Sequence, residues 1–463
     1  MEAVQSRKEN KMGTMPVNRL LISMSLPMML SMLVQALYNI VDSIFVSRID
    51  ENALTAVSMA FPIQSLMIAI GTGTGVGVNA LLSRSLGEKD YEKADKTAVN
   101  GVFLYALSYL LFLIVGLLVT TPFYLSQTTD AQIISYGKQY LTIICCCSFG
   151  MYMQFIFERL LQSTGKTFYT MITQGTGAII NIILDPIFIF GYFGVPRMGV
   201  AGAAAATVTG QVIAGIMGII INEKKNTEIK FRVKGFRPDG QIIGQIYKVG
   251  IPSIIMQAIG SVMTYGMNQI LIAFSSTAVA VFGVYFKLQS FIFMPIFGLN
   301  NGMVPIIAYN YGAAQKDRLV KTLKYSIMYA MGLMAVGFLV FQIFPVQLFA
   351  MFEASEIMLA IGVPALRTIS VSFLLAGFCI ICGSLFQALG NGVYSLVVSI
   401  ARQLLVLLPA AYLLSLTGDV KYVWWAFPIA EVVSLAVTVF FVMRINKKVI
   451  RNIGVERAGN GLT

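Results

Sequence analysis

Two stretches of the chain, QSLMIAIGTGTGVG (Gln64–Gly77) and QSFIFMPIFGLNNG (Gln289–Gly302), share their first two residues and two glycines at matching positions. An offset of 225 residues separates them. The same offset relates further pairs in the two halves: Leu26-Pro27 and Ile251-Pro252, Gly87 and Gly312, Lys96 and Lys321, and Gln162/Gly165 and Gln387/Gly390. A constant spacing over about 140 residues indicates a duplicated structural unit.

The composition places both copies in a membrane. Hydrophobic residues make up 57% of the chain and charged residues 12%, whereas a soluble domain carries about 25% charged residues. No charged residue occurs in 52–83, 97–129 or 249–286. Each stretch exceeds the roughly 20 residues that a helix needs to cross a bilayer.

Each half divides into six hydrophobic spans, so we expect an all-α integral membrane protein with twelve transmembrane helices in two pseudo-symmetric six-helix lobes. Because six is even, both halves enter the membrane in the same direction, as in one class of secondary transporters. The predicted spans are 20–47, 53–80, 97–123, 133–161, 168–193, 199–222, 246–274, 277–308, 322–346, 357–388, 394–416 and 423–445. The predicted parts are an N-terminal tail (1–19), an N-lobe (20–222), a linker (223–245), a C-lobe (246–445) and a C-terminal tail (446–463).

The basic residues predict the orientation. Most of the 33 Lys and Arg residues lie in the two tails and in the connections on the same side of the membrane. The opposite connections hold Arg48, Lys138, Arg197 and Lys421. Since cytoplasmic loops carry the excess of basic residues, we expect a multi-pass protein of the plasma (cytoplasmic) membrane with both termini cytoplasmic. This rule accounts for the net charge of +12, so no nucleic-acid partner is expected.

The residue types limit the chemistry. The chain has no histidine, which excludes histidine metal sites and histidine proton relays. Its five cysteines lie in apolar spans, and the Cys379/Cys382 pair has no second pair or histidine to complete a zinc site. We therefore interpret the cysteines as packing residues, and we expect neither a cofactor nor an enzyme active site.

Two acids in the first half have no basic partner within the apolar parts of their spans. Asp42 lies in the first span and Asp185 in the fifth, at similar depths in the outer half of the membrane. A buried carboxylate without a partner takes up a proton or recruits a cation. Asn181 lies one helical turn from Asp185, and Thr207 in the sixth span lies near the same depth. These oxygens suit a hard cation such as Na⁺; the alternative is that Asn181 and Thr207 only join helices.

The other intramembrane charges allow structural interpretations. Glu158 has Arg159 beside it and Lys166 nearby, so an ion pair at the membrane interface and a role in transport are both open. In the second half, Glu431 is expected to pair with one of the bases found there, which are Lys287, Arg367 and Arg402. A cation site is therefore expected in the first lobe.

Glycines and prolines interrupt several spans. The run from Gly71 to Gly77 lacks the GK[ST] ending of a phosphate loop, and it is interpreted as a site of close helix packing or a flexible hinge. Pro27 and Pro186 each remove a backbone hydrogen bond. Pro186 directly follows Asp185, so both prolines are candidate hinges.

The chain resembles the multidrug and toxic compound extrusion (MATE) transporters over nearly its whole length. The motifs that carry the resemblance are YNIVDSIFVSR (Tyr38–Arg48), LGEKDYEKA (Leu86–Ala94), QSTGKT (Gln162–Thr167), NIILDPIFIFG (Asn181–Gly191) and GVAGAAAATVTGQ (Gly199–Gln211). The resemblance implies a V-shaped fold and export of organic cations and other amphiphiles by antiport against H⁺ or Na⁺.

The resemblance also implies residue roles and the state of assembly. The ion-coupling positions of the family fall on Asp42, Asn181 and Asp185, with Thr207 less securely matched, and the first three are the candidate Na⁺ ligands. The predicted substrate-binding residues are Gln35, Tyr38, Gln64 and Gln154. We expect a monomer in the lipid bilayer that binds small cationic or amphiphilic molecules.

One branch of the family, the NorM-like proteins, uses acids in the seventh and tenth spans. Here MQAIGSVMTYGMNQ (Met256–Gln269) and AGFCIICGSLFQALG (Ala376–Gly390) contain none. The chain therefore resembles the branches that rely on the first lobe.

The alternatives differ in their charge and motifs. A lipid-linked oligosaccharide flippase of the same superfamily needs a cationic cavity. Lys287, Arg367 and Arg402 leave this alternative open, but the acidic first lobe counts against it. A membrane-embedded enzyme lacks support, since no HExxH or histidine cluster occurs. A duplicated bundle with unpaired acids favours alternating access over a passive channel.

Overall fold

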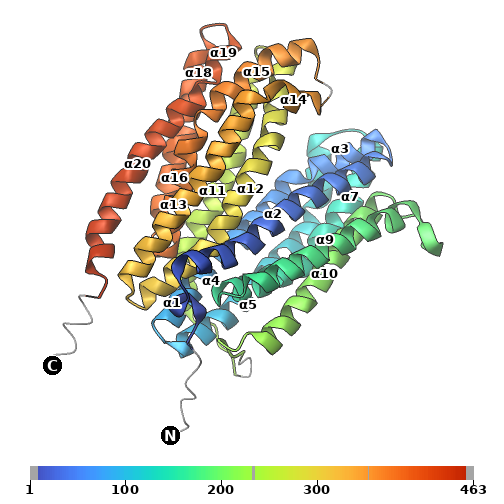
Figure 1. Cartoon of the computed structure of the whole chain (residues 1–463). Coiled ribbons are helices and arrows are strands. Elements are labelled where there is room, and N and C mark those ends of the chain that lie inside the picture. Colours follow the sequence, from blue (N-terminus) through green and yellow to red (C-terminus); the bar gives the residue numbers. More distant parts are fainter. Residues whose placement is uncertain (1–8, 232–234, 353, 455–463) are drawn as a thin grey trace, which may run out of the picture.

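The computed structural model of the chain describes residues 9–231, 235–352 and 354–454. These residues form two groups of helices that lie close together at the end of the molecule bearing both termini and diverge toward the other end (Figure 1). The predicted tails and linker lie partly outside the described residues.

The first group is the N-lobe. Its long helices are α2, α4, α5, α9 and α10, and a bent pair, α7 and α8, completes it (Figure 1). The bounds in this half are α1 Lys11–Thr14, α2 Val17–Ser47, α3 Glu51–Met59, α4 Phe61–Gly87, α5 Tyr91–Leu118, α6 Thr120–Gln127, α7 Ala131–Cys146, α8 Phe149–Ser163, α9 Thr167–Phe190, the 3₁₀ turn η1 Tyr192–Gly194 and α10 Val200–Lys225.

The second group is the C-lobe, which repeats this order. Its bounds are α11 Gly240–Ile272, α12 Ser276–Gly312, α13 Lys316–Ile343, α14 Pro345–Ala350, α15 Glu356–Ser370, α16 Phe373–Ala388, α17 Gly392–Ile400, the π-helical segment η2 Ala401–Leu407, α18 Leu408–Ser415, α19 Val420–Val423, α20 Ala426–Lys448 and the 3₁₀ turn η3 Ile450–Asn452. Within the described residues, 10 helices are long and apolar enough to cross a membrane, or up to 12 if each bent pair is one span. The predicted helical membrane fold is confirmed.

The two bent spans occupy equivalent places in the repeat. The axis turns by 42° between α7 and α8 and by 50° between α15 and α16. The breaks fall at residues 147–148 and 371–372, which the 225-residue offset nearly superimposes. Pro27 and Pro186 lie inside the continuous helices α2 and α9. Their role as hinges stays a prediction.

Several helices extend beyond the predicted spans at the end that bears the termini. The α4 helix continues to Gly87, and α11 begins at Gly240, six residues before the predicted span. The Asp239 side chain accepts hydrogen bonds from the N–H groups of Gln241 and Ile242 and so caps α11. Hydropathy marks the part of a helix that contacts lipid, whereas caps determine where the helix ends.

The lobes contact each other through the glycines of the duplicated motif. The α2 helix packs on α12, and α4 packs on α11. A Cβ atom at Gly77 would lie 2.1 Å from the Ile246 carbonyl oxygen, and one at Gly302 would lie 2.4 Å from Ser25 Oγ. Small residues allow helix backbones to approach this closely. The glycine run therefore serves close packing, and it lies within the continuous helix α4.

The contact continues to the ends of these helices. A Cβ atom at Gly87 would lie 2.0 Å from the Tyr309 carbonyl oxygen, and one at Gly312 would lie 2.1 Å from that of Arg84. Polar bonds across the lobes add to it: Arg159 Nη1 donates to Asn301 Oδ1 at 3.1 Å. We call these glycines, Gly73, Gly77 and Gly87 with Gly298, Gly302 and Gly312, the glycine seam.

Replacing a seam glycine tests this packing. Gly77→Ala and Gly302→Ala should each destabilise the protein by about 1–3 kcal/mol, because the new methyl group overpacks the contact. Gly332→Ala is the matched control, since Gly332 is an exposed glycine of α13 with no atom within 4 Å of a built Cβ. It should be neutral or stabilise the helix. Thermal unfolding in detergent measures the difference; equal melting temperatures for all three variants would contradict the seam.

Candidate functional site

A small cavity lies inside the N-lobe, lined by side chains from α2, α4, α8, α9 and α10. Five of the predicted residues line it: Gln35, Tyr38, Gln154, Asn181 and Thr207. Its volume is about 100 Å³, below the roughly 300–1,000 Å³ of pockets that hold drug-sized ligands. In this conformation the cavity has the size for ions and water. Gln64 is not among the lining residues; its Nε2 donates to the Tyr140 hydroxyl at 3.1 Å.

The two predicted carboxyl groups come together beside this cavity. Asp42 on α2 and Asp185 on α9 lie close enough to interact electrostatically, because α2 packs on α9. Asp185 is fully buried. Neither of its carboxyl oxygens, nor Oδ1 of Asp42, has a hydrogen-bond partner among the described residues.

The amide and hydroxyl neighbours complete the arrangement. Asn181 lies one turn before Asp185 on α9, and its Nδ2 donates to Thr207 Oγ1 on α10 at 3.2 Å. Asn181 is buried, and its Oδ1 has no hydrogen-bond partner among the described residues. The four residues predicted for ion coupling therefore come from three helices that pack together.

This arrangement has a definite chemical requirement. Leaving buried carboxylates charged and unpartnered costs several kcal/mol, and two adjacent negative charges repel. A proton held by the pair would remove one charge, and a hard cation would be bound by both carboxylates and the Asn181 oxygen. The donor set fits Na⁺, which prefers oxygen ligands as other hard cations do. The site is suited to taking up and releasing one positive charge.

Glu158 on α8 lies among neutral donors. Gln154 Nε2 and Thr173 Oγ1 donate to its Oε1 at 2.9 and 3.1 Å, and Gln174 Nε2 donates to its Oε2 at 2.8 Å. Lys166 instead pairs with Glu228 at 3.1 Å, and Arg159 donates to Gln162 and Asn301. Glu158 therefore forms no ion pair with either base among the described residues, and the ion-pair alternative is wrong. Glu158 is connected to the cavity through Gln154 and Gln174.

Sequence reasoning missed Gln174 and Gln211, which also line the cavity. The signal was present on α9, where Thr170, Gln174, Asn181 and Asp185 recur at spacings of four, seven and four residues. Such spacing gives a helix one polar face. In an apolar span this face identifies the side that points away from lipid.

The C-lobe uses its charges differently. Arg402, on the π-helical segment, pairs with the buried Glu431 on α20 at 3.4 Å, so the predicted pairing of Glu431 is confirmed. Lys287 lies over the Phe352 ring at 5.9 Å. Arg367 is exposed on α15. Glu431, the buried acid of the C-lobe, is paired with a base, whereas Asp42 and Asp185 in the N-lobe form no ion pair among the described residues.

A scan of known families matches this chain to one model, described as MatE, over residues 27–187 and again over 252–413. The two matches begin 225 residues apart, which is the offset of the sequence repeat. They cover more than half of the chain.

Known proteins are similar to this chain over most of its length. The multidrug export protein MepA of Staphylococcus haemolyticus (strain JCSC1435) is 29% identical over 425 residues, which cover 92% of this chain and 93% of that protein. MepA of Staphylococcus aureus (strain N315) is 28% identical over 90% of this chain and 91% of its own length.

Among solved structures, an outward-facing multidrug resistance MATE family transporter of the MOP superfamily superposes with a TM-score of 0.89. It is 26% identical, and the match covers 95% of this chain and 98% of that one. A MATE structure in complex with MaL6 gives a TM-score of 0.89 at 27% identity, over 96% of this chain and 99% of that one. The protein is therefore a multi-pass membrane transporter rather than an enzyme, and it belongs to the MATE family.

Proposed function

We propose that this protein is a secondary active antiporter that exports organic cations and other amphiphiles in exchange for H⁺ or Na⁺. The observation that carries the proposal is the Asp42–Asp185 pair. Asp185 is buried, Asp42 is half-buried, and Oδ1 of Asp42 and both carboxyl oxygens of Asp185 lack hydrogen-bond partners among the described residues. Such a pair binds one positive charge and releases it when the surroundings change. The relatives named multidrug export proteins support the class of substrate.

The arrangement of the lobes supports alternating access. They meet along the glycine seam at the end that bears the termini and diverge at the other end (Figure 1). The basic residues favour cytoplasmic termini, so the end at which the lobes diverge would face outward. The tails (1–19 and 446–463) and the linker (223–245) then lie in the cytoplasm, and the protein acts as a monomer in the plasma membrane.

In this mechanism the ion and the substrate compete for the N-lobe. Neutralising Asp42 and Asp185 removes the negative charge that attracts an organic cation toward Gln35, Tyr38, Gln64 and Gln154. Bending of α2 at Pro27 and of α9 at Pro186 would then close the cavity, since each proline removes a backbone hydrogen bond. The flippase alternative is weakened because Glu431 already compensates the charge of Arg402.

The first test concerns the carboxyl pair. Asp42→Asn and Asp185→Asn should each lower gradient-driven efflux of a fluorescent cation from proteoliposomes by at least about tenfold, because an amide cannot take up the coupling charge. Asp130→Asn is the matched control. Asp130 is an exposed N-cap of α7, and Asn caps a helix equally well, so this variant should transport normally.

The driving ion is varied in the same assay. Efflux is measured with a pH gradient alone and with a Na⁺ gradient alone, and the gradient that supports efflux identifies the coupling ion. Wild-type protein that responds to neither gradient, or an Asp42→Asn variant that transports at the wild-type rate, would contradict the antiporter.

The second test concerns the lining of the cavity. Gln35→Ala should raise the KM for a cationic substrate about fivefold with a smaller change in kcat, because the loss of one hydrogen bond costs about 1 kcal/mol. Gln139→Ala serves as the control, since Gln139 is exposed on α7 and bonds to Ser135 of its own helix. Concentration-dependent efflux measures both parameters. An unchanged KM in Gln35→Ala would remove Gln35 from the substrate site.

A further inference from the structure

The first described residues of the chain contact both lobes at the end where the lobes meet. The short helix α1 and its flanking residues, Asn10–Met15, lie between the turn that joins α8 to α9 and the facing ends of α12 and α13. The Met12 side chain is fully buried.

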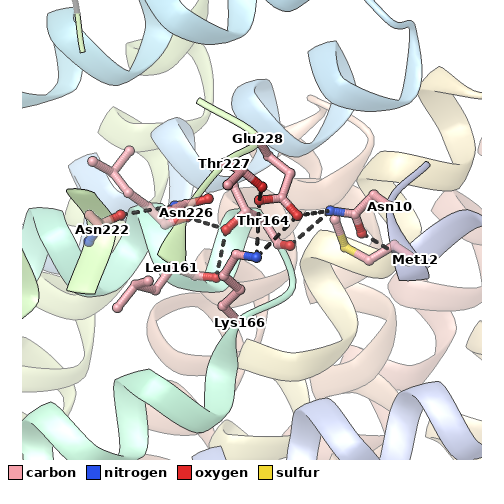
Figure 2. Close-up of polar contacts among 10 residues, drawn as sticks. Asn10, Met12, Leu161, Thr164, Lys166, Asn222, Asn226, Thr227 and Glu228 are labelled. Atoms are coloured by element: carbon pink, nitrogen blue, oxygen red, sulfur yellow. Dashed lines mark hydrogen bonds and ion pairs between the residues drawn. The ribbon is translucent and has the colours of Figure 1, made fainter. Parts of the chain in front are cut away.

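The N-lobe side of this contact is polar (Figure 2). Asn10 Nδ2 donates to the Thr164 carbonyl oxygen at 2.9 Å and to Glu228 Oε1 at 3.3 Å. Its Oδ1 accepts from the Met12 N–H at 2.9 Å and so caps α1. Lys166 also binds Glu228. Burial, followed by the nearby charge of Lys166, lowers the pKa of Lys11.

The C-lobe side satisfies the main-chain carbonyl groups of α1. Arg318 Nη2 donates to the carbonyl oxygens of Met12 and Met15 at 3.0 and 2.7 Å, and Asn310 Nδ2 donates to Met12 at 3.1 Å. Arg318 Nε also donates to Asn310 Oδ1 at 3.2 Å. The last carbonyl groups of a helix lack internal partners, and a cation is stabilised there. Gly13 lies against the Tyr309 ring, since a Cβ would be 3.0 Å from Cε1.

The duplication did not create this contact. At the 225-residue offset, Arg318 corresponds to Lys93 and Asn310 to Ser85. The Ser85 hydroxyl donates to the Leu81 carbonyl of its own helix. Among the described residues, the Lys93 side chain has no hydrogen bond or ion pair. The donors that hold α1 are therefore particular to the second half.

We propose that Asn10–Met15 is a latch that fastens the lobes together at the end bearing the termini, and that it must release α12 and α13 before the lobes part there. The inference rests on the proposed alternating access. The latch continues directly into α2 through Pro16, so it stays with the N-lobe when the lobes separate. Only its bonds to Asn310 and Arg318 then have to break.

The test measures the separation of the lobes in full-length protein. Spin labels are placed at Lys225→Cys on α10 and Lys321→Cys on α13, both exposed, after replacement of the five native cysteines. Double electron–electron resonance then measures the distance between the two labels and gives the populations of short and long separations. Arg318→Ala should raise the ratio of long to short separations at least about tenfold over wild type, because charge-assisted bonds to two carbonyls are lost.

Matched variants keep the test specific. Asn310→Ala should shift the ratio in the same direction, Arg318→Lys should shift it less than Arg318→Ala, and Lys93→Ala should leave it at the wild-type value. Unchanged ratios in Arg318→Ala and Asn310→Ala would overturn the latch, provided that wild-type protein shows both separations. If wild-type protein shows one separation under every pH, Na⁺ and substrate condition, alternating access fails and the latch fails with it.

Discussion

The close approach of helix backbones at the glycine seam is the constraint on which the rest of the structure depends. At Gly77 and Gly87, and at their counterparts Gly302 and Gly312, no side chain larger than hydrogen fits against the facing helix. Because the seam lies at one end, the lobes diverge at the other (Figure 1). The seam therefore holds the two lobes together at this end, with the Asp42–Asp185 pair in the N-lobe.

The duplication accounts for the architecture that the two lobes share, and the candidate ion site lies where their charges differ. Both halves keep the bent span and the seam glycines at the same offset. The C-lobe acid Glu431 is paired with Arg402, whereas no base among the described residues pairs with the N-lobe acids Asp42 and Asp185. A transporter needs one charged group whose partner comes and goes. In the proposed mechanism the N-lobe provides this group, whereas the C-lobe pairs its buried acid with Arg402.

Much of the fold and of the candidate site was predictable from the sequence. The signals are either periodic, as the hydropathy and the repeat are, or energetically unfavourable, as charged groups in an apolar span are. Hydropathy located the spans, the offset located the repeat, and unpaired acids in apolar surroundings pointed to Asp42 and Asp185. Helix ends were missed because caps such as Asp239 act locally, outside the apolar segments. The partners of Glu158 were missed because adjacency in the chain suggested a base, whereas helix packing brought Gln174 close. Long-range contacts of this kind leave no local pattern.

The contacts of Asn10–Met15 also bear on how the protein is assembled. Arg318 and Asn310 are 306 and 298 residues away in sequence from Met12, whose carbonyl group they bind. During synthesis Asn10–Met15 therefore has to wait for these C-lobe partners until the N-lobe, α11, α12 and the start of α13 have been made. The two lobes cannot be joined at this point until then. Closure of this contact is thus a late event in biogenesis, and it marks a molecule in which both halves have reached the membrane.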